Sequence, residues 1–178
     1  MTGYVALLYS ILLPAGRLRM ADWRVVLETE GLEDVRTVLS TGNAVFTAQR
    51  TSIGKLEAGL EAAYERAFSR RVDHIVRTAT AFRTLVAANP FPEETERDPG
   101  HVAVRVMRSA LGDADLGALA ERATPREKLA IVNGDLWLYS PEPPGKSRVV
   151  ALLSRERSGI GTIRTWGTIR RLGEMLED

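Results

Sequence analysis

Short apolar runs and helical stripes follow one another along the first half of the chain. A continuous apolar run over residues 4–10 predicts a buried strand, and Pro14–Arg17 predicts a loop. From Ala21 onward, apolar side chains at helical spacing predict a helix that Gly31 ends, because glycine readily takes the left-handed conformation. Three further runs predict strands, at 35–40, 44–48 and 71–77.

The clearest helix of the chain is expected between the second and third of these later strands. A hydroxyl residue, Thr51 or Ser52, can cap its start, and a long apolar stripe follows. Glu57 and Glu61 fall outside that stripe, so they are expected on the outer side of the helix. The order of elements over residues 1–78 is therefore strand, helix, strand, strand, helix, strand.

The second half of the chain repeats this order after a helix at 80–88 and a proline-rich stretch at 90–100 that predicts an exposed linker. Asn133-Gly134 is a strong signal for a hairpin turn, because both residues tolerate positive φ. The predicted elements are a strand at 101–107, a helix at 113–121, strands at 127–132 and 135–140, a helix at 144–157, a strand at 159–163 and a last helix capped by Thr165.

Two passes of one element order predict an α+β protein made of two tandem ferredoxin-like (βαββαβ) subdomains, each with an antiparallel sheet and helices on one face. The first subdomain is expected at 1–78, a connecting helix and linker at 79–100, and the second subdomain with the C-terminal helix at 101–178.

Several short motifs resemble the bacterial family called domain of unknown function 1697 (DUF1697), in order from the first strand to the last helix. They are Tyr4–Leu8, Met20–Trp23, Thr41–Phe46, Asn89–Phe91, Trp137–Tyr139 and Thr165-Trp166 with Thr168. The resemblance implies a cytoplasmic bacterial protein with an α+β fold built on ferredoxin-like units. It implies no activity, because the family has none established.

The chain departs from the family pattern after the first strand. Relatives usually carry Arg-Gly-Ile-Asn-Val-Gly-Gly there, followed by a lysine-rich stretch, whereas this chain has the shorter and more apolar Tyr9–Gly16, followed by Arg17 and Arg19. If that loop binds a polar ligand in relatives, the resemblance implies that the site is lost or altered here.

Composition excludes some kinds of chemistry. The chain has no cysteine, so disulfides, thiolate catalysis and cysteine-bound zinc are ruled out. The longest apolar stretch, Tyr4–Leu13, is too short to span a bilayer, and no basic residue precedes it as in a signal peptide. We therefore expect a cytoplasmic protein without a membrane partner, and no motif indicates a cofactor.

Gly145-Lys146-Ser147 resembles part of a phosphate-binding loop but lacks the first glycine of a Walker motif, and prolines precede it. A weaker hypothesis is that a helix start with Lys146, Ser147 and Arg148 binds a small anionic ligand, together with Arg17 and Arg19. The alternative is an ordinary helix cap with solvated cations.

A third hypothesis concerns nucleic acid. The segment 145–173 carries seven Lys or Arg residues and one acidic residue, and Trp137 with Tyr139 alternates with leucines, so both rings are expected on the open face of the sheet beside Arg105. Stacking of bases on these rings is one interpretation, and burial of the rings under another layer is the other. The net charge of +1 argues against strong nucleic-acid binding.

His74 and His101 are the two histidines, and neither has neighbours at metal-ligand spacing, so no metal site is expected. No catalytic motif was found, and whether the protein is an enzyme stays open. The preferred hypothesis is a binding or interaction module. A binder or enzyme of small phosphorylated or anionic molecules and a weak nucleic-acid binder are the alternatives.

Overall fold

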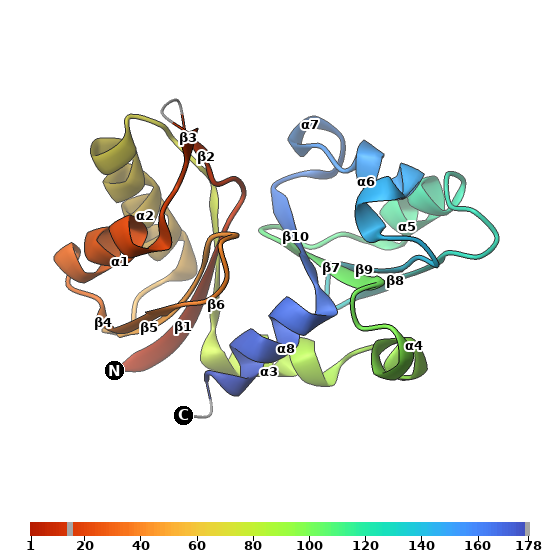
Figure 1. Ribbon diagram of the computed structural model, residues 1–178, viewed down its shortest axis with the longest axis horizontal. Coiled ribbons are helices and arrows are strands. Elements are labelled where there is room, and N and C mark those ends of the chain that lie inside the picture. Colours follow the sequence, from red (N-terminus) through yellow and green to blue (C-terminus); the bar gives the residue numbers. More distant parts are fainter. Residues whose placement is uncertain (14–15, 177–178) are drawn as a thin grey trace. The chain divides into compact units, whose positions relative to one another are not determined.

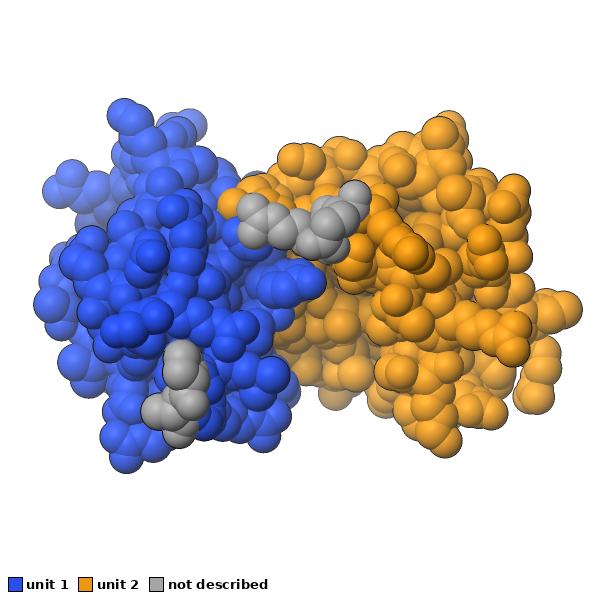
Figure 2. All heavy atoms as spheres, turned by 90° about the horizontal axis from the view of Figure 1, so that it is seen from above, with its two compact units in different colours: residues 1–83, 172–178 blue, residues 84–171 orange. Residues whose placement is uncertain are grey.

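The protein's structure is a computed structural model that describes residues 1–13 and 16–176. Pro14 and Ala15, at the start of the loop predicted at Pro14–Arg17, lie outside the described residues. The chain divides into two compact units, unit 1 (Met1–Arg83 and Leu172–Asp178) and unit 2 (Thr84–Arg171), coloured separately in Figure 2. It is a mixed α/β protein with two sheet-rich halves and antiparallel sheets.

Unit 1 holds a four-stranded antiparallel sheet in the order β4-β5-β1-β6, with two helices on one of its faces (Figure 1). The elements that lie wholly within it are β1 (Thr2–Leu8), β2 (Leu12–Leu13), β3 (Gly16–Arg17), α1 (Met20–Thr29), β4 (Glu33–Thr37), β5 (Asn43–Ala48), α2 (Ile53–Phe68) and β6 (His74–Thr78). The unit boundaries fall inside α3 (Ala79–Ala87) and α8 (Trp166–Glu174).

The core of unit 1 lies between the sheet and helices α1 and α2. Tyr4 pairs with Phe46 across β1 and β5, so both side chains lie on the same face, and their rings stack with centroids 5.8 Å apart. Trp23 from α1 and Tyr64 from α2 are fully buried against them. Tyr4, Trp23 and Phe46 therefore all belong to the core of unit 1.

The start of α2 and the end of α1 are as the sequence predicts. Ser52 caps α2 by accepting a hydrogen bond from the Lys55 N–H at 3.4 Å. Gly31, with φ of 79°, ends α1, and the Leu32 N–H donates a hydrogen bond to the Leu27 carbonyl at 3.3 Å.

Glu57 and Glu61 are not on the outer side of α2, and that prediction was wrong. Both are buried, with 6% and 4% of their surface exposed. A Glu57 carboxylate oxygen accepts the Val76 N–H at 2.9 Å, and Glu61 accepts the His74 N–H at 3.2 Å. Because β6 is an edge strand, these N–H groups have no neighbouring strand on that side, and the two carboxylates take its place.

Unit 2 contains a second four-stranded antiparallel sheet, in the order β10-β7-β9-β8, with helices α5, α6 and α7 on one side of it (Figure 1). The elements that lie wholly within it are α4 (Pro92–Arg97), β7 (Val102–Met107), α5 (Asp113–Ala120), β8 (Lys128–Val132), β9 (Asp135–Tyr139), the 3₁₀ turn η1 (Pro144–Lys146), α6 (Arg148–Leu152), α7 (Arg155–Ser158) and β10 (Gly161–Thr165). The predicted hairpin is confirmed, since Asn133 and Gly134 both have positive φ and join β8 to β9.

Two predicted segments of unit 2 differ from the structure. The single helix expected at 144–157 is broken into η1, α6 and α7, because Ser147 is extended and its side chain accepts the Val149 N–H to start a new helix. The exposed linker expected at 90–100 contains α4, in which Glu94 and Thr95 are buried.

Candidate binding surfaces

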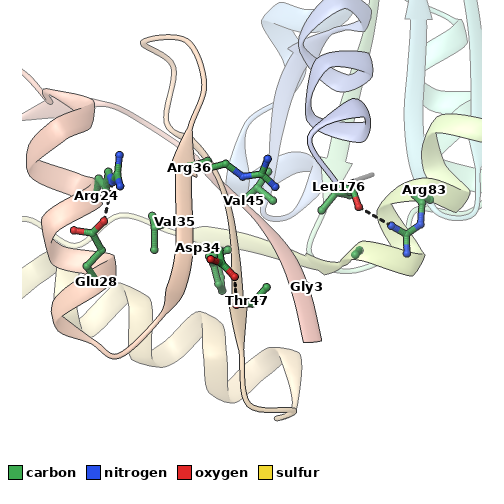
Figure 3. A pocket seen from close by; sticks show the side chains of 12 residues that line it. Gly3, Arg24, Glu28, Asp34, Val35, Arg36, Val45, Thr47, Arg83 and Leu176 are labelled. Carbon is green, nitrogen blue, oxygen red and sulfur yellow. Dashed lines mark hydrogen bonds and ion pairs between the residues drawn. The ribbon is translucent and has the colours of Figure 1, made fainter. Parts of the chain in front are cut away.

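A broad hollow of about 840 Å³ lies in unit 1 around the edge strand β4 (Figure 3). Its lining is rich in charged and polar side chains, and these are bonded to one another or to the backbone. Arg24 pairs with Glu28 at 2.7 Å, and the Thr47 hydroxyl donates to Asp34 at 3.2 Å. A ligand in this hollow would have to replace contacts that the protein already makes.

Two arginines of the same hollow bind carbonyl groups near the end of the chain. The Arg36 guanidinium donates to the Met175 carbonyl at 2.5 Å, and Arg83 donates to the Leu176 carbonyl at 3.2 Å. Figure 3 shows the Arg83 contact beside the hollow. These arginines connect residues 172–176 to unit 1, which is a structural role.

A hollow of about 290 Å³ in unit 2 contains three of the predicted anion-binding residues. Lys146, Ser147 and Arg148, which are consecutive in the chain, all line it. Arg126, from the turn before β8, adds a third cation. Lys146 has one carboxylate near it, Glu142, with 3.9 Å between Nζ and Oε2 on exposed side chains.

Glu127 occupies part of this hollow and already receives several hydrogen bonds. The Thr124 N–H donates to its carboxylate at 2.7 Å. Burial alone would raise the pKa of Glu127, but bonds from the Ser147 hydroxyl, from Thr124 and from Ser140 outweigh it and hold the pKa below its ordinary value. The Ser147 hydroxyl is therefore engaged by the protein's own carboxylate, and the cations Arg126, Lys146 and Arg148 remain at the rim.

An apolar hollow of about 390 Å³ adjoins the cationic one. Helix α5 contributes Leu116 and Ala120, the following turn contributes Ala123, and β8 contributes Leu129. Thr124 and Glu127 line both hollows, so the apolar and cationic surfaces are continuous. We call the two together the β8 groove.

Arg17 and Arg19 belong to unit 1, apart in the chain from Lys146–Arg148 of unit 2. Arg19 binds Asp22 through two hydrogen bonds of 2.8 and 2.9 Å. Those bonds with Asp22 raise the pKa of the Arg19 guanidinium. Arg19 thus already has a carboxylate partner, while Arg17 is exposed on β3.

The predicted stacking residues do not share one face of the second sheet. Arg105 pairs with Leu136, and Trp137 pairs with Val104, so the register places Arg105 on the opposite face from Trp137. Arg105 is buried and donates to the Gly159 carbonyl at 2.8 Å. The prediction of a common open face for Arg105 and Trp137 was wrong, because it assumed a register shifted by one residue.

Trp137 and Tyr139 are both in contact with other parts of unit 2. Trp137 is 1% exposed, and its ring lies against Trp166 with centroids 5.7 Å apart. The Tyr139 hydroxyl accepts a hydrogen bond from Arg97 of α4 at 3.2 Å, and the same guanidinium lies over the ring. A base could stack on Trp137 only if the Trp166 ring moved away from it.

In the basic segment 145–173, Arg164 is buried, and burial lowers the pKa of Arg164 to about 10.

The histidines lie in different settings. His74 is fully buried, and its Nδ1 is 2.9 Å from the Val72 carbonyl oxygen, whereas His101 is half-buried before β7. Among the described residues, no group of three or more histidine or acidic side chains is placed to hold a metal ion. No helix within residues 1–13 and 16–176 is both long and apolar enough to cross a membrane.

Sequence reasoning missed Arg126, Glu127 and the apolar half of the β8 groove. Arg126 and Glu127 stand directly before β8, whereas the sequence placed Glu127 inside a strand at 127–132 and gave Arg126 no role. The alanines of α5 did not indicate a binding surface, because small apolar residues are equally common in helices that bind no ligand.

Comparison with known protein families identifies the family of this chain. A family model described as "Protein of unknown function (DUF1697)" matches residues 1–137. The chain belongs to the DUF1697 family. The sequence resemblance is thereby confirmed, and the matched residues cover unit 1 from Met1 to Arg83 and the part of unit 2 that includes α5, β8 and Trp137.

A DUF1697 assignment brings no activity with it, and no curated protein matches the chain. One solved structure similar to it is the conserved bacterial protein SP0830 from Streptococcus pneumoniae. It has a TM-score of 0.78 and 22% sequence identity, and the similarity covers 100% of this chain and 99% of that one. At this identity the likeness concerns the fold alone.

Proposed function

We propose that the protein is a binding module whose contact surface is the β8 groove of unit 2. One observation carries the proposal: an apolar hollow and a cationic hollow share Thr124 and Glu127, so a single ligand can contact both. Binding sites commonly combine a concave apolar surface with a few polar groups that orient the ligand.

The charges of the groove define the ligand class. Arg126, Lys146 and Arg148 stand at one end, where Glu127 is already bonded to hydroxyl and N–H groups of the protein. Guanidinium and ammonium groups bind carboxylates and phosphates. The ligand therefore has an anionic group next to an apolar part.

The experiment follows backbone amide signals of the full chain by NMR while small probes are added. Octanoate carries both an apolar tail and a carboxylate, and it should shift signals on both sides of the groove, such as those of Ala123 and Arg148. Acetate lacks the tail and octylammonium reverses the charge, so each should shift them far less. Inorganic phosphate tests binding of a bare anion.

The paired variant Lys146→Glu/Arg148→Glu reverses the cationic end and should remove the octanoate response. Both side chains are exposed, so the fold should persist. Arg17→Glu, an exposed cation of unit 1, is the matched control and should leave the response unchanged. Equal responses to octanoate and octylammonium, or octanoate shifts confined to unit 1, would contradict the proposal.

We also propose that each unit contains a ferredoxin-like subdomain with bounds close to the predicted 1–78 and 101–178, except that residues 172–178 of the predicted second subdomain belong to unit 1. Both four-stranded sheets have the same topology when their strands are counted in chain order. The first strand, β1 or β7, lies between the third and the fourth, and the second lies outside the third. Limited proteolysis should then cut first between residues 79 and 100. A first cut inside either sheet would count against these boundaries.

The protein is further proposed to act in a bacterial cytoplasm. Its lack of cysteine suits a reducing compartment, and the similar solved structure comes from a bacterium. Fractionation of the source cells, with detection of the chain by antibody, tests this directly.

A further inference from the structure

One edge of the second sheet is open. The two-residue turn Asn133–Gly134 makes Val132 and Asp135 the first hydrogen-bonded pair of the β8–β9 ladder, and such pairs alternate along antiparallel strands. The N–H and C=O groups of Leu129 and Ile131 therefore point away from β9. Within the described residues, none of these groups has a hydrogen-bond partner.

Strand β8 also lacks the usual protection of a sheet edge. It pairs with β9 in unbroken register from Lys128 to Val132, without a bulge. Its one charged side chain, Lys128, is held by Glu94 of α4. Exposed edges that are regular and apolar pair readily with another extended chain.

The apolar half of the β8 groove lies where the side chain of an added strand would enter. Residues directly opposite each other on neighbouring strands share a face of the sheet. A residue paired with Leu129 would thus point to the face where Leu129 packs with Leu119 and Leu136. On that side the hollow is bounded by Leu116 and Ala120 of α5.

The cationic half of the groove lies at the beginning of β8. Arg126 and Glu127 immediately precede the strand, and Lys146 and Arg148 line the same hollow. An extended segment on β8 would meet these three cations after it passes Leu129. A carboxylate at that point complements them.

We infer that β8 binds an extended peptide segment as an added fifth strand. An apolar side chain of the peptide lies in the apolar half of the β8 groove, and a carboxylate lies beside Arg126, Lys146 and Arg148. The carboxylate belongs to an acidic side chain or to the peptide's C-terminus. This inference rests on the proposed binding function and adds to it the partner and the main-chain pairing. Strand addition gains affinity from backbone hydrogen bonds and specificity from alternate side chains.

The test begins with a displayed library of random ten-residue peptides, selected against the full chain. The selected peptides should share an apolar residue at alternate positions and a carboxylate at one end. The consensus peptide is then synthesised, and its affinity is measured by fluorescence polarisation. Absence of any selected peptide would overturn the inference.

Two changes test the main-chain pairing. Methylation of each peptide amide in turn should weaken binding about fivefold at every second position, since the loss of a hydrogen bond of about 1 kcal/mol corresponds to that change in affinity. Ile131→Pro removes an outward N–H of the edge strand and should weaken binding about as much, whereas Ile131→Val should not. The methylation series needs no protein variant, so it remains decisive if Ile131→Pro fails to fold.

Further measurements distinguish a failure of strand addition from a failure of the proposed binding function. C-terminal amidation and replacement of acidic residues by their amides identify which carboxylate binds. Binding that Lys146→Glu/Arg148→Glu abolishes but methylation leaves unchanged would keep the binding surface and overturn strand addition. Binding that responds to neither would overturn both.

Self-association is the remaining outcome. Sedimentation analysis should show a monomer, because the inferred partner of β8 is a peptide. A dimer that Ile131→Pro converts to monomer would assign the edge to a second copy of the chain and overturn the inference.

Discussion

The two sheets have the same strand order but treat their edges differently. In unit 1, the outward N–H groups of β6 are bonded by Glu57 and Glu61 from α2. The opposite edge, β4, has irregular register beside Asp34, whose φ is positive, and it carries charged side chains. In unit 2, β8 is regular and apolar, and its outward groups are open.

The same sheet topology therefore has a closed edge at β6 in unit 1 and an open edge at β8 in unit 2. A sheet edge that is occupied by buried carboxylates cannot accept another strand without losing those bonds, so unit 1 is closed at β6. An edge that is left regular beside a hollow is available for contact. Predictions that open the closed edge, or alter the open one, test this distinction.

The largest effect is expected from the double variant Glu57→Leu/Glu61→Leu. It leaves the Val76 and His74 N–H groups without these carboxylates in a buried place, which should lower the free energy of unfolding by about 3 kcal/mol. It should also expose β6 to pairing, which light scattering would detect as association. Glu57→Gln keeps an acceptor and should cost much less, and a double variant as stable as the parent in urea would contradict the role given to these residues.

A smaller loss is expected from Gly134→Val at the tip of the β8–β9 hairpin. Gly134 has a φ of 84°, and a Cβ there would lie 2.4 Å from the Ala110 Cβ. Strain and overlap together should cost about 2 to 3 kcal/mol in chemical unfolding. Gly145→Ala is the matched control, because nothing lies within 4 Å of a Cβ at that position. Equal stability of the two variants would show that the hairpin tip is not rigid.

The smallest effect is expected from Glu127→Gln, in the cationic half of the β8 groove. Because the pKa of Glu127 is held low in the folded chain, its carboxylate stabilises unit 2 above the ordinary glutamate pKa, about 4.3. That contribution disappears as the pH falls through the lower folded pKa. The variant should lose about 1 kcal/mol at pH 7 and show a shallower loss of stability in acid.

Thermal unfolding between pH 3 and 7 measures this acid dependence. Glu142→Gln is the control, since Glu142 is exposed and its ion pair with Lys146 is long, at 3.9 Å. An identical pH profile for the parent and Glu127→Gln would refute the role of the bonds from Ser147 and Thr124.

Local pattern predicted most of the fold. The apolar runs, the Gly31 helix end, the Ser52 cap and the Asn133-Gly134 turn each depend on neighbours in sequence, and all are present. Glu57 and Glu61 were misplaced because a helical stripe sorts residues by polarity. Their burial depends on β6 lying at an edge, which is a matter of sheet order.

The candidate site was predicted in part for the same reason. Lys146, Ser147 and Arg148 are consecutive and could be found by reading along the chain. Arg105 was assigned to the wrong face, because the register of β7 against β9 is set by pairing between distant segments. The apolar half of the β8 groove needs α5 beside β8, and no local signal indicates that neighbour.

The division of the chain also bears on how the protein is made. Unit 1 receives residues 172–176 through Arg36 and Arg83, so its last part emerges from the ribosome only after all of unit 2 has been synthesised. The sheet of unit 1 can form early, since its strands end at Thr78. Completion of the first unit therefore waits for the second, and a nascent chain halted before residue 172 would present the guanidinium groups of Arg36 and Arg83 without their carbonyl partners.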